Sequence, residues 1–137
     1  MDPVMLPVRS DDLDTNGHVR GPAYLAYADH ARWAALIAAG VDLDGLRGHG
    51  LGPVNLETTI RYLQELWSND TVTVTSATEW GTGKTARIVQ QLHRGDGVLV
   101  AEVRSVSGLL DLCTRRLVPR PGAYWQAHAT APELLGL

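Results

Sequence analysis

The chain has 137 residues, a length that suits one domain with a normal hydrophobic core. A formal net charge of −3 and an isoelectric point near 5.9 leave no basic footprint for nucleic acid, and the single cysteine excludes a disulfide or a cysteine zinc cluster within one chain. The sequence shows neither a signal segment nor a stretch of about 18 apolar residues, so we expect a soluble cytoplasmic protein with no membrane partner.

The first part of the chain predicts a strand, a loop and one long helix. Residues 3–9 are apolar and contain valines, as in a strand, and polar residues fill a loop over 10–21. The segment 22–39 predicts a helix, because proline suits its first turn and Gly40 suits its end. Eight of its residues are alanine, and small side chains suit a helix that another element wraps closely. A glycine-rich connection over 40–52 follows.

The rest of the chain predicts antiparallel strands. Apolar and polar residues alternate from Val54 to Leu63, with Leu56 on the apolar face, which is the period of a half-buried strand. Further strands are expected over 71–80, 84–93 and 98–110, and 113–118 is expected to continue the last one after a bend.

The order of these elements predicts an α+β fold in which an antiparallel sheet curls around one helix. The tail from 122 to 137 is expected to form a short helix that packs on the sheet or on a neighbouring subunit. We therefore predict a single domain over residues 1–137, with a core of about 3–119 and a C-terminal tail over 120–137.

The loop before the helix carries two carboxylates, Asp12 and Asp14, ahead of a Gly21-Pro22 helix start. Unpaired N–H groups at a helix start carry partial positive charge and attract the negative charge that develops on a substrate oxygen. A carboxylate beside such groups is enough to open an acyl bond. Aspartate in an Asp-Thr-Asn-Gly sequence also caps its own loop in an Asx-turn, so both interpretations of Asp14 stay open, while Asp12 is expected to support the loop.

These residues resemble a known family. The order D-x-D-x-x-G-H-V, then Y-L-x-Y on a helix, then I-x-Y-L on a strand resembles the 4-hydroxybenzoyl-CoA thioesterase-like branch of the hotdog fold, from about residue 8 to about residue 119. The residues that carry the resemblance are Asp12, Asp14, Gly17, His18, Val19, Tyr24, Leu25, Tyr27, Arg32, Ile60, Arg61, Tyr62 and Leu63. It implies five to six strands wrapped around one long central helix, with sheet edges that pair between the subunits of a homodimer or a dimer of dimers.

The resemblance also implies hydrolysis of an acyl thioester of CoA or of an acyl-carrier protein, with no cofactor and no metal. Asp14 falls on the aspartate that acts on the thioester carbonyl, either as a nucleophile that gives a transient mixed anhydride or as a general base on water. The backbone N–H of Gly21 is the expected oxyanion donor, with Ala23 next in line. His18 is expected to line the site.

Substrate contacts are expected at Val19, Arg20, Tyr24, Lys84 and Arg87. The family commonly has two asparagines where this chain has Arg20-Gly21, so Gly21 leaves room for an acyl group and Arg20 offers a charge to a carboxylated substrate or a pantetheine phosphate. Lys84 and Arg87 are expected to meet CoA phosphates, and a second basic cluster stands near the last strand at Arg115, Arg116 and Arg120. The helical spacing of Tyr24 is equally typical of a core position.

Other functions stay open. A hotdog hydratase or dehydratase uses the order D-x-N-P-x-H, whereas residues 14–18 of this chain read D-T-N-G-H, one residue short and without the proline. A non-catalytic module would capture a thioester without opening it. Some hotdog branches use a glutamate on the helix, which makes Asp29, the acid on this helix, a further candidate.

Overall fold

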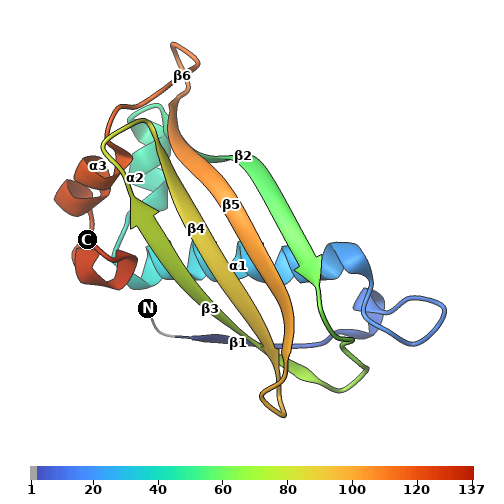
Figure 1. Ribbon diagram of the computed structural model, residues 1–137. Helices are drawn as coiled ribbons and strands as arrows, with labels where there is room; N and C mark the ends of the chain where they lie inside the picture. The colour runs from blue at the N-terminus through green and yellow to red at the C-terminus, as the bar shows by residue number, and fades with distance from the viewer. Residues whose placement is uncertain (1–2) are drawn as a thin grey trace.

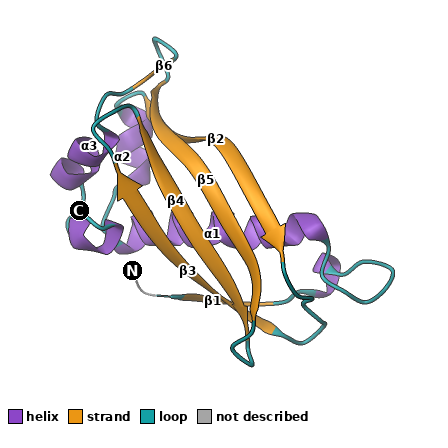
Figure 2. Ribbon diagram, in the orientation of Figure 1, coloured by secondary structure: helices purple, strands orange, loops and turns teal. Residues whose placement is uncertain are grey.

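A computed structural model describes residues 3–137, in which a curved antiparallel sheet packs against one long helix (Figures 1 and 2). The elements in chain order are β1 Val4–Pro7, η1 Ser10–Asp12, α1 Gly21–Ala38, α2 Leu43–Gly48, β2 Leu51–Tyr62, β3 Thr71–Trp80, β4 Thr85–Arg94, β5 Leu99–Asp111, β6 Arg116–Leu117, α3 Pro121–His128 and η2 Pro132–Leu135. Within the described residues, no helix is long and apolar enough to cross a membrane.

The strands lie in the order β1-β3-β4-β5-β2, every neighbouring pair is antiparallel, and β6 pairs with the end of β5. The helix α1 crosses one face of this sheet, and α2, α3 and η2 gather near the C-terminal end of α1 (Figure 1). The loop that precedes α1 and the turn between β3 and β4 therefore lie at opposite ends of the molecule. The expected curled sheet around one long helix is confirmed.

Alanine lets α1 approach the sheet closely. Ala23, Ala28, Ala31 and Ala35 are buried, and Ala28 and Ala31 have no exposed surface. A proline in the first turn and Gly40, which adopts the left-handed φ of +77°, mark the two ends of the helix. The boundaries differ by one residue from the expected segment 22–39, and the reason given for the helix, its small side chains, agrees with the packing.

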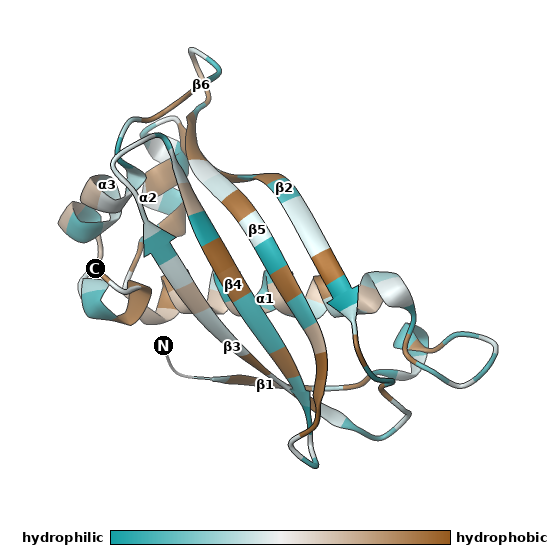
Figure 3. Cartoon of the chain, viewed as in Figure 1, coloured by the Kyte–Doolittle hydropathy of each residue, from teal (hydrophilic) through white to brown (hydrophobic). Residues whose placement is uncertain are grey.

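A row of polar side chains divides the interior. Hydrophobic and hydrophilic residues alternate along β4 and β5 in Figure 3, and four polar ones face α1: Thr58, Ser76, Gln90 and Ser105, called here the polar row. Gln90 Nε2 donates hydrogen bonds to Ala28 O at 2.9 Å and to Ser76 Oγ at 3.0 Å. One apolar cluster packs around the N-terminal half of α1 and another around its C-terminal half and the C-terminal segment.

Strand β2 departs from the simple alternation that its sequence predicts. Glu57 pairs with Val106, while Asn55 pairs with Ser107, so Leu56 is the extra residue of a β-bulge. The bulge shifts the later residues to the opposite face, and Leu56 is 50% exposed rather than on the buried side. The expectation for Leu56 was therefore wrong, because a bulge has no signature in the period-two pattern.

Two connections also differ from the expectation. The glycine-rich segment 40–52 contains the helix α2, whose first turn is capped by the Asp42 carboxylate, which accepts a hydrogen bond from Gly45 N at 3.1 Å. The segment 113–118 does not continue β5. Arg115 adopts a φ of +60°, the chain turns back, and β6 runs antiparallel to the end of β5. The path of the chain in these two connections therefore depends on single residues, the helix cap Asp42 and Arg115 with its positive φ.

Candidate active site

The loop before α1 is closed by Asp14. Its Oδ1 accepts hydrogen bonds from Asn16 N at 2.8 Å and from His18 N at 3.1 Å, and its own N–H donates to His18 O at 2.7 Å. Gly17 adopts a φ of +79°, which this tight turn requires. Within the described residues, Asp14 Oδ2 accepts no hydrogen bond, and the side chain is exposed. The Asx-turn is therefore present, and it leaves one carboxylate oxygen available for chemistry.

Asp12 anchors the same loop to the helix. Its Oδ2 accepts hydrogen bonds from Tyr27 Oη at 2.7 Å and from Arg9 N at 3.1 Å. Its backbone oxygen accepts from Arg20 N at 2.7 Å. Burial, and then the hydrogen bond to Asp12, raise the pKa of Tyr27 well above its usual range. The supporting role expected for Asp12 is confirmed.

His18 lies between an aromatic ring and a carboxylate. Its ring meets the Trp67 ring edge-on with 4.4 Å between centroids, and its Nε2 is 3.7 Å from Glu65 Oε2. The backbones of His18 and Trp67 form an isolated bridge. The imidazole thus lies between Trp67 and Glu65, while the backbone N–H of His18 donates to Asp14 Oδ1.

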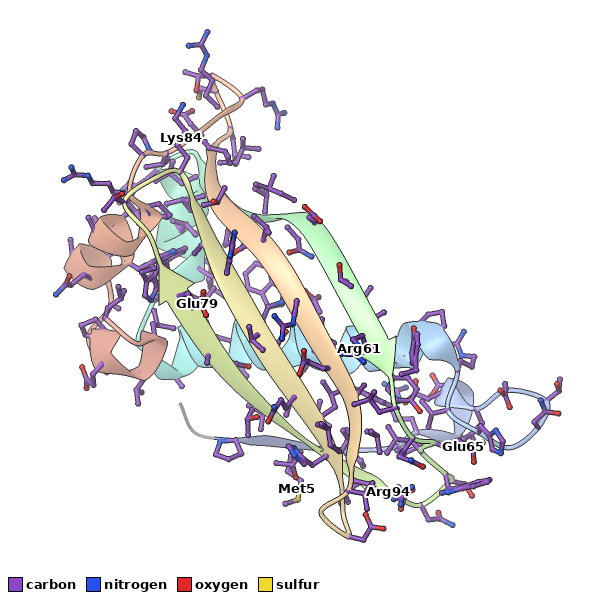
Figure 4. All side chains as sticks on the ribbon, in the orientation of Figure 1. Met5, Arg61, Glu65, Glu79, Lys84 and Arg94 are labelled. Carbon is purple, nitrogen blue, oxygen red and sulfur yellow. The ribbon has the colours of Figure 1, made fainter. Side chains whose placement is uncertain are left out.

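The segment that carries Glu65 is fixed from two sides. Arg94 Nη1 donates to Glu65 O at 2.8 Å, and the Arg94 guanidinium also binds both carboxylate oxygens of Asp96. These bonds lower the pKa of Asp96 and raise the pKa of Arg94. On the other side, Tyr24 Oη accepts from Leu66 N at 3.1 Å. Figure 4 shows Glu65 and Arg94 at the same end of the molecule.

Val19 and Tyr24, two of the expected substrate contacts, are core residues in this chain, 5% and 4% exposed. Val19 N donates to Leu66 O at 3.0 Å, and burial raises the pKa of the Tyr24 hydroxyl. Both side chains therefore pack in the core beneath the loop and do not line its surface. The core position that helical spacing suggested for Tyr24 is confirmed. Arg20 is exposed at the junction of loop and helix.

One backbone donor remains at the start of α1. Pro22 has no N–H, and the N–H of Ala23 already donates to Arg20 O at 3.0 Å, so neither residue offers a free donor. The N–H of Gly21 has no acceptor within the described residues, as the first turn of a helix requires. Tyr62 Oη donates to Gly21 O at 3.0 Å, and a Cβ at Gly21 would lie only 3.2 Å from that hydroxyl. A side chain at position 21 would therefore have to push the Tyr62 hydroxyl aside by a few tenths of an ångström.

The basic residues lie at the other end. Lys84 stands in the β3–β4 turn, and Figure 4 shows it far from Glu65. Arg120 N donates to Gly83 O at 3.1 Å, which brings the two basic clusters that the sequence separates into one group, called here the basic end: Lys84, Arg115, Arg116 and Arg120. Arg87 is exposed on β4. Within one chain the structure does not bring Lys84 or Arg87 to Asp14, because β5, at 13 residues, is about 43 Å long.

Sequence reasoning missed a polar cluster under the middle of α1. Arg32 Nη2 pairs with Asp29 Oδ1 at 2.8 Å, and Arg32 Nη1 donates to Asn55 Oδ1 and Ser105 Oγ, each at 3.2 Å. Asp29, Arg32 and Asn55 border a cavity of about 130 Å³ between α1, the sheet and the C-terminal segment. The sequence marks such a cluster by small polar residues on the strand face that points toward α1. The bulge in β2 changes which residues of that strand face α1, so the pattern could not be recognised from the sequence. Within residues 3–137, no three histidine, cysteine, aspartate or glutamate side chains gather as a metal site would require.

Comparison with known proteins gives a consistent result. A family model described as the thioesterase-like superfamily matches residues 8–130. PA2801, a proposed thioesterase from Pseudomonas aeruginosa, is 26% identical, with 91% of this chain and 95% of that chain covered and a TM-score of 0.79. SAV2348 from Staphylococcus aureus, solved in complex with CoA, is 22% identical, with 93% and 82% covered and a TM-score of 0.80. No curated protein sequence matches this chain.

A third solved structure is a 1,4-dihydroxy-2-naphthoyl-CoA thioesterase, Slr0204 from Synechocystis, which is 16% identical, with 91% of this chain and 93% of that chain covered and a TM-score of 0.82. These likenesses confirm the expected hotdog fold. The expectation of a thioester hydrolase is confirmed at the level of the family, whereas no comparison singles out the 4-hydroxybenzoyl-CoA branch.

Proposed function

Because this chain belongs to the thioesterase-like superfamily, we propose that it hydrolyses an acyl-CoA thioester to the free acid and CoA. The observation that carries the proposal is the geometry of the loop. Asp14 uses one carboxylate oxygen to hold its turn and exposes the other, on the loop that leads into α1, where the Gly21 N–H has no acceptor within the described residues. A carboxylate and an oxyanion donor next to each other fit acyl transfer.

In the general-base route, Asp14 Oδ2 takes a proton from water, and the water oxygen attacks the thioester carbonyl. The carbonyl oxygen becomes an oxyanion that the Gly21 N–H stabilises. The C–S bond then breaks, and the thiolate receives the proton held by Asp14. In the nucleophilic route, Asp14 Oδ2 attacks the carbonyl itself, CoA leaves, and water hydrolyses the mixed anhydride. Either route uses the same oxygen.

We propose that the active unit contains two copies of the chain. Strand β2 stands at the sheet edge, and Leu56 on it is half exposed, which is costly for a long edge without a partner. On α1, a stripe at helical spacing is also exposed: Leu25, Trp33 and Ile37. A second copy that pairs its β2 antiparallel to this one covers both surfaces with the same two-fold interface.

The two-fold pairing also completes the substrate site. Tyr62, at the C-terminal end of β2, contacts Gly21 at the start of α1, and the N-terminal end of β2 lies toward the basic end. Antiparallel pairing of two β2 strands therefore brings the Asp14 loop of one copy toward the basic end of the other. Arginine and lysine there are suited to CoA phosphates. The CoA complex of SAV2348 supports CoA as the carrier, and no observation favours a carrier protein.

The test is thiol release from a panel of acyl-CoA thioesters, compared between the wild type and Asp14→Asn. Asparagine retains Oδ1 as an acceptor for Asn16 N and His18 N, so the loop keeps its turn while the carboxylate is lost. We expect turnover to fall by about 10²–10⁴-fold with an unchanged melting temperature. Wild-type rates in Asp14→Asn would remove Asp14 from the mechanism.

A further inference from the structure

The cavity under α1 has a size that a ligand can use. Its volume is about 130 Å³, and three indole rings line it, from Trp33, Trp80 and Trp125. In another protein, an apolar cavity of about 150 Å³ takes up benzene. The space therefore matches about one six-membered ring.

The lining orients an occupant. The exposed residues around the cavity are Asp29 and Trp33 on α1 and Asn55 on β2, so the mouth opens between these two elements. The rest of the lining is largely apolar, with Leu36, Ile88 and the indoles of Trp80 and Trp125, and its polar members are Arg32, Ser76, Thr78 and Ser107. An apolar group thus fits inside, and a polar group attached to it remains at the mouth.

The C-terminal segment closes the inner end. Trp125 and Leu135, 5% and 7% exposed, line the cavity from α3 and η2. Trp80 Nε1 donates to Leu135 O at 2.7 Å, and a Cβ on Gly122 would lie only 3.1 Å from the Trp80 ring. The wall is therefore packed against β3 without spare room.

A second attachment holds the same segment to α1. Ala131 N donates to Ala39 O at 2.9 Å, and Thr130 lies so close to Gly40 that no side chain fits at that glycine. A chain longer than the cavity would have to displace a segment that is anchored both to β3 and to the end of α1.

We propose that this cavity is the acyl site and that residues 121–137 are its end wall, so the enzyme accepts compact acyl groups of about one ring and rejects long chains. The inference rests on the proposed function. The mouth lies between α1 and β2, the surface that we assign to the second copy, whose Asp14 loop would hold the thioester. The C-terminal segment then acts as a determinant of acyl size.

The experiment measures kcat/KM for benzoyl-CoA, hexanoyl-CoA and palmitoyl-CoA. We expect the wild type to favour the two compact thioesters over palmitoyl-CoA by at least about tenfold. Trp125→Ala opens the end wall and should raise the relative rate on palmitoyl-CoA by about tenfold, with a smaller gain in the milder Leu135→Ala. Met5→Ala, on the exposed outer edge, is the control and should leave the preference unchanged.

A palmitoyl-CoA rate equal to that on benzoyl-CoA in the wild type, or an unchanged preference in both wall variants, would overturn the inference. A second measurement does not depend on hydrolysis. Benzoate and hexanoate should quench tryptophan fluorescence saturably in Asp14→Asn, and Leu135→Ala should weaken this binding, because the lost side chain lines the cavity. Absence of thiol release from every thioester would count against the proposed function, and the fluorescence titration would then decide the cavity alone.

Discussion

The Tyr27 hydroxyl group donates a hydrogen bond to Asp12 Oδ2 at 2.7 Å, which ties the loop to the second turn of α1. Asp14, two residues later, bonds only within its own loop. The two carboxylates of the D-x-D sequence therefore differ in role: the first is bonded to the helix, and the second is exposed. Asp12 holds the loop in place from the buried side, and Asp14 is presented to the surface by the turn that it caps.

Replacing Asp12 with alanine should destabilise the protein without removing its chemistry. The change leaves the buried Tyr27 hydroxyl and the Arg9 N–H without their acceptor, at a cost of about 1–3 kcal/mol in the free energy of unfolding. Urea denaturation measures this cost. Asp11→Ala is the control, since Asp11 is exposed and pairs only with the exposed Arg9, and it should change the free energy of unfolding by no more than about 0.5 kcal/mol. Equal effects of the two variants would contradict the assignment.

Alkaline pH should reveal the same hydrogen bond. Burial and the bond to Asp12 raise the pKa of Tyr27 above its ordinary value of 10.0, so the folded state favours the protonated hydroxyl. This contribution to stability is complete below about pH 10 and is lost as the pH rises further toward the folded pKa. Melting temperatures from about pH 8 to about pH 11 should fall less steeply in Tyr27→Phe than in the wild type. Parallel curves would show that Tyr27 ionises equally in both states.

Acidic pH should lower the stability that the Arg94–Asp96 pair contributes. The hydrogen bonds from Arg94 lower the pKa of Asp96 below its ordinary value of 3.8, so the folded state favours the carboxylate. The contribution is present above about pH 4 and is lost as the pH falls through the folded pKa. Asp96→Asn should already lack it at neutral pH, and its melting temperature should depend less on pH below about pH 4 than that of the wild type. An identical acid dependence in the variant would exclude a role for the Arg94–Asp96 pair.

The second copy can be tested on the exposed stripe of α1. Ile37 is 63% exposed on that stripe, and Met5 is 69% exposed on β1, at the other edge of the sheet. Ile37→Asp should place a charge in the proposed interface and shift the mass measured by analytical ultracentrifugation toward one chain, with a loss of thiol release. Met5→Asp should keep both the mass and the activity. A wild type that sediments as a single chain would refute the proposed pairing.

The predictable part of the fold came from periodic segments. The strand expected over 71–80 forms as β3, and the alanine-rich segment forms α1, because both patterns extend over many residues. The unpredictable parts depend on single residues. Leu56 is displaced by a bulge, Asp42 caps a helix inside a glycine-rich connection, and Arg115 turns the chain back at a positive φ.

The candidate site was predictable to a similar degree. Asp14 and His18 are close in the sequence and are joined by hydrogen bonds of the same turn, and Gly21 follows three residues later at the start of α1. Lys84 is expected at the same site from its charge alone, and only the three-dimensional arrangement shows that it lies at the opposite end of the chain. Glu65 was missed because its position beside His18 depends on Arg94 and on the path of the chain after β2, neither of which follows from a sequence pattern.

The polar row has a consequence for how the molecule opens. The buried apolar residues form two separate clusters on either side of it, so we expect the cluster that contains Trp125 and Leu135 to unfold locally while the cluster that contains Tyr24 and Leu66 stays intact. Amide hydrogens of α3 should then exchange with deuterated solvent sooner than those of the first half of α1. Local unfolding of this kind would give each half of the interior its own stability, so that mutation can reshape the C-terminal half without disturbing the loop that Asp14 closes.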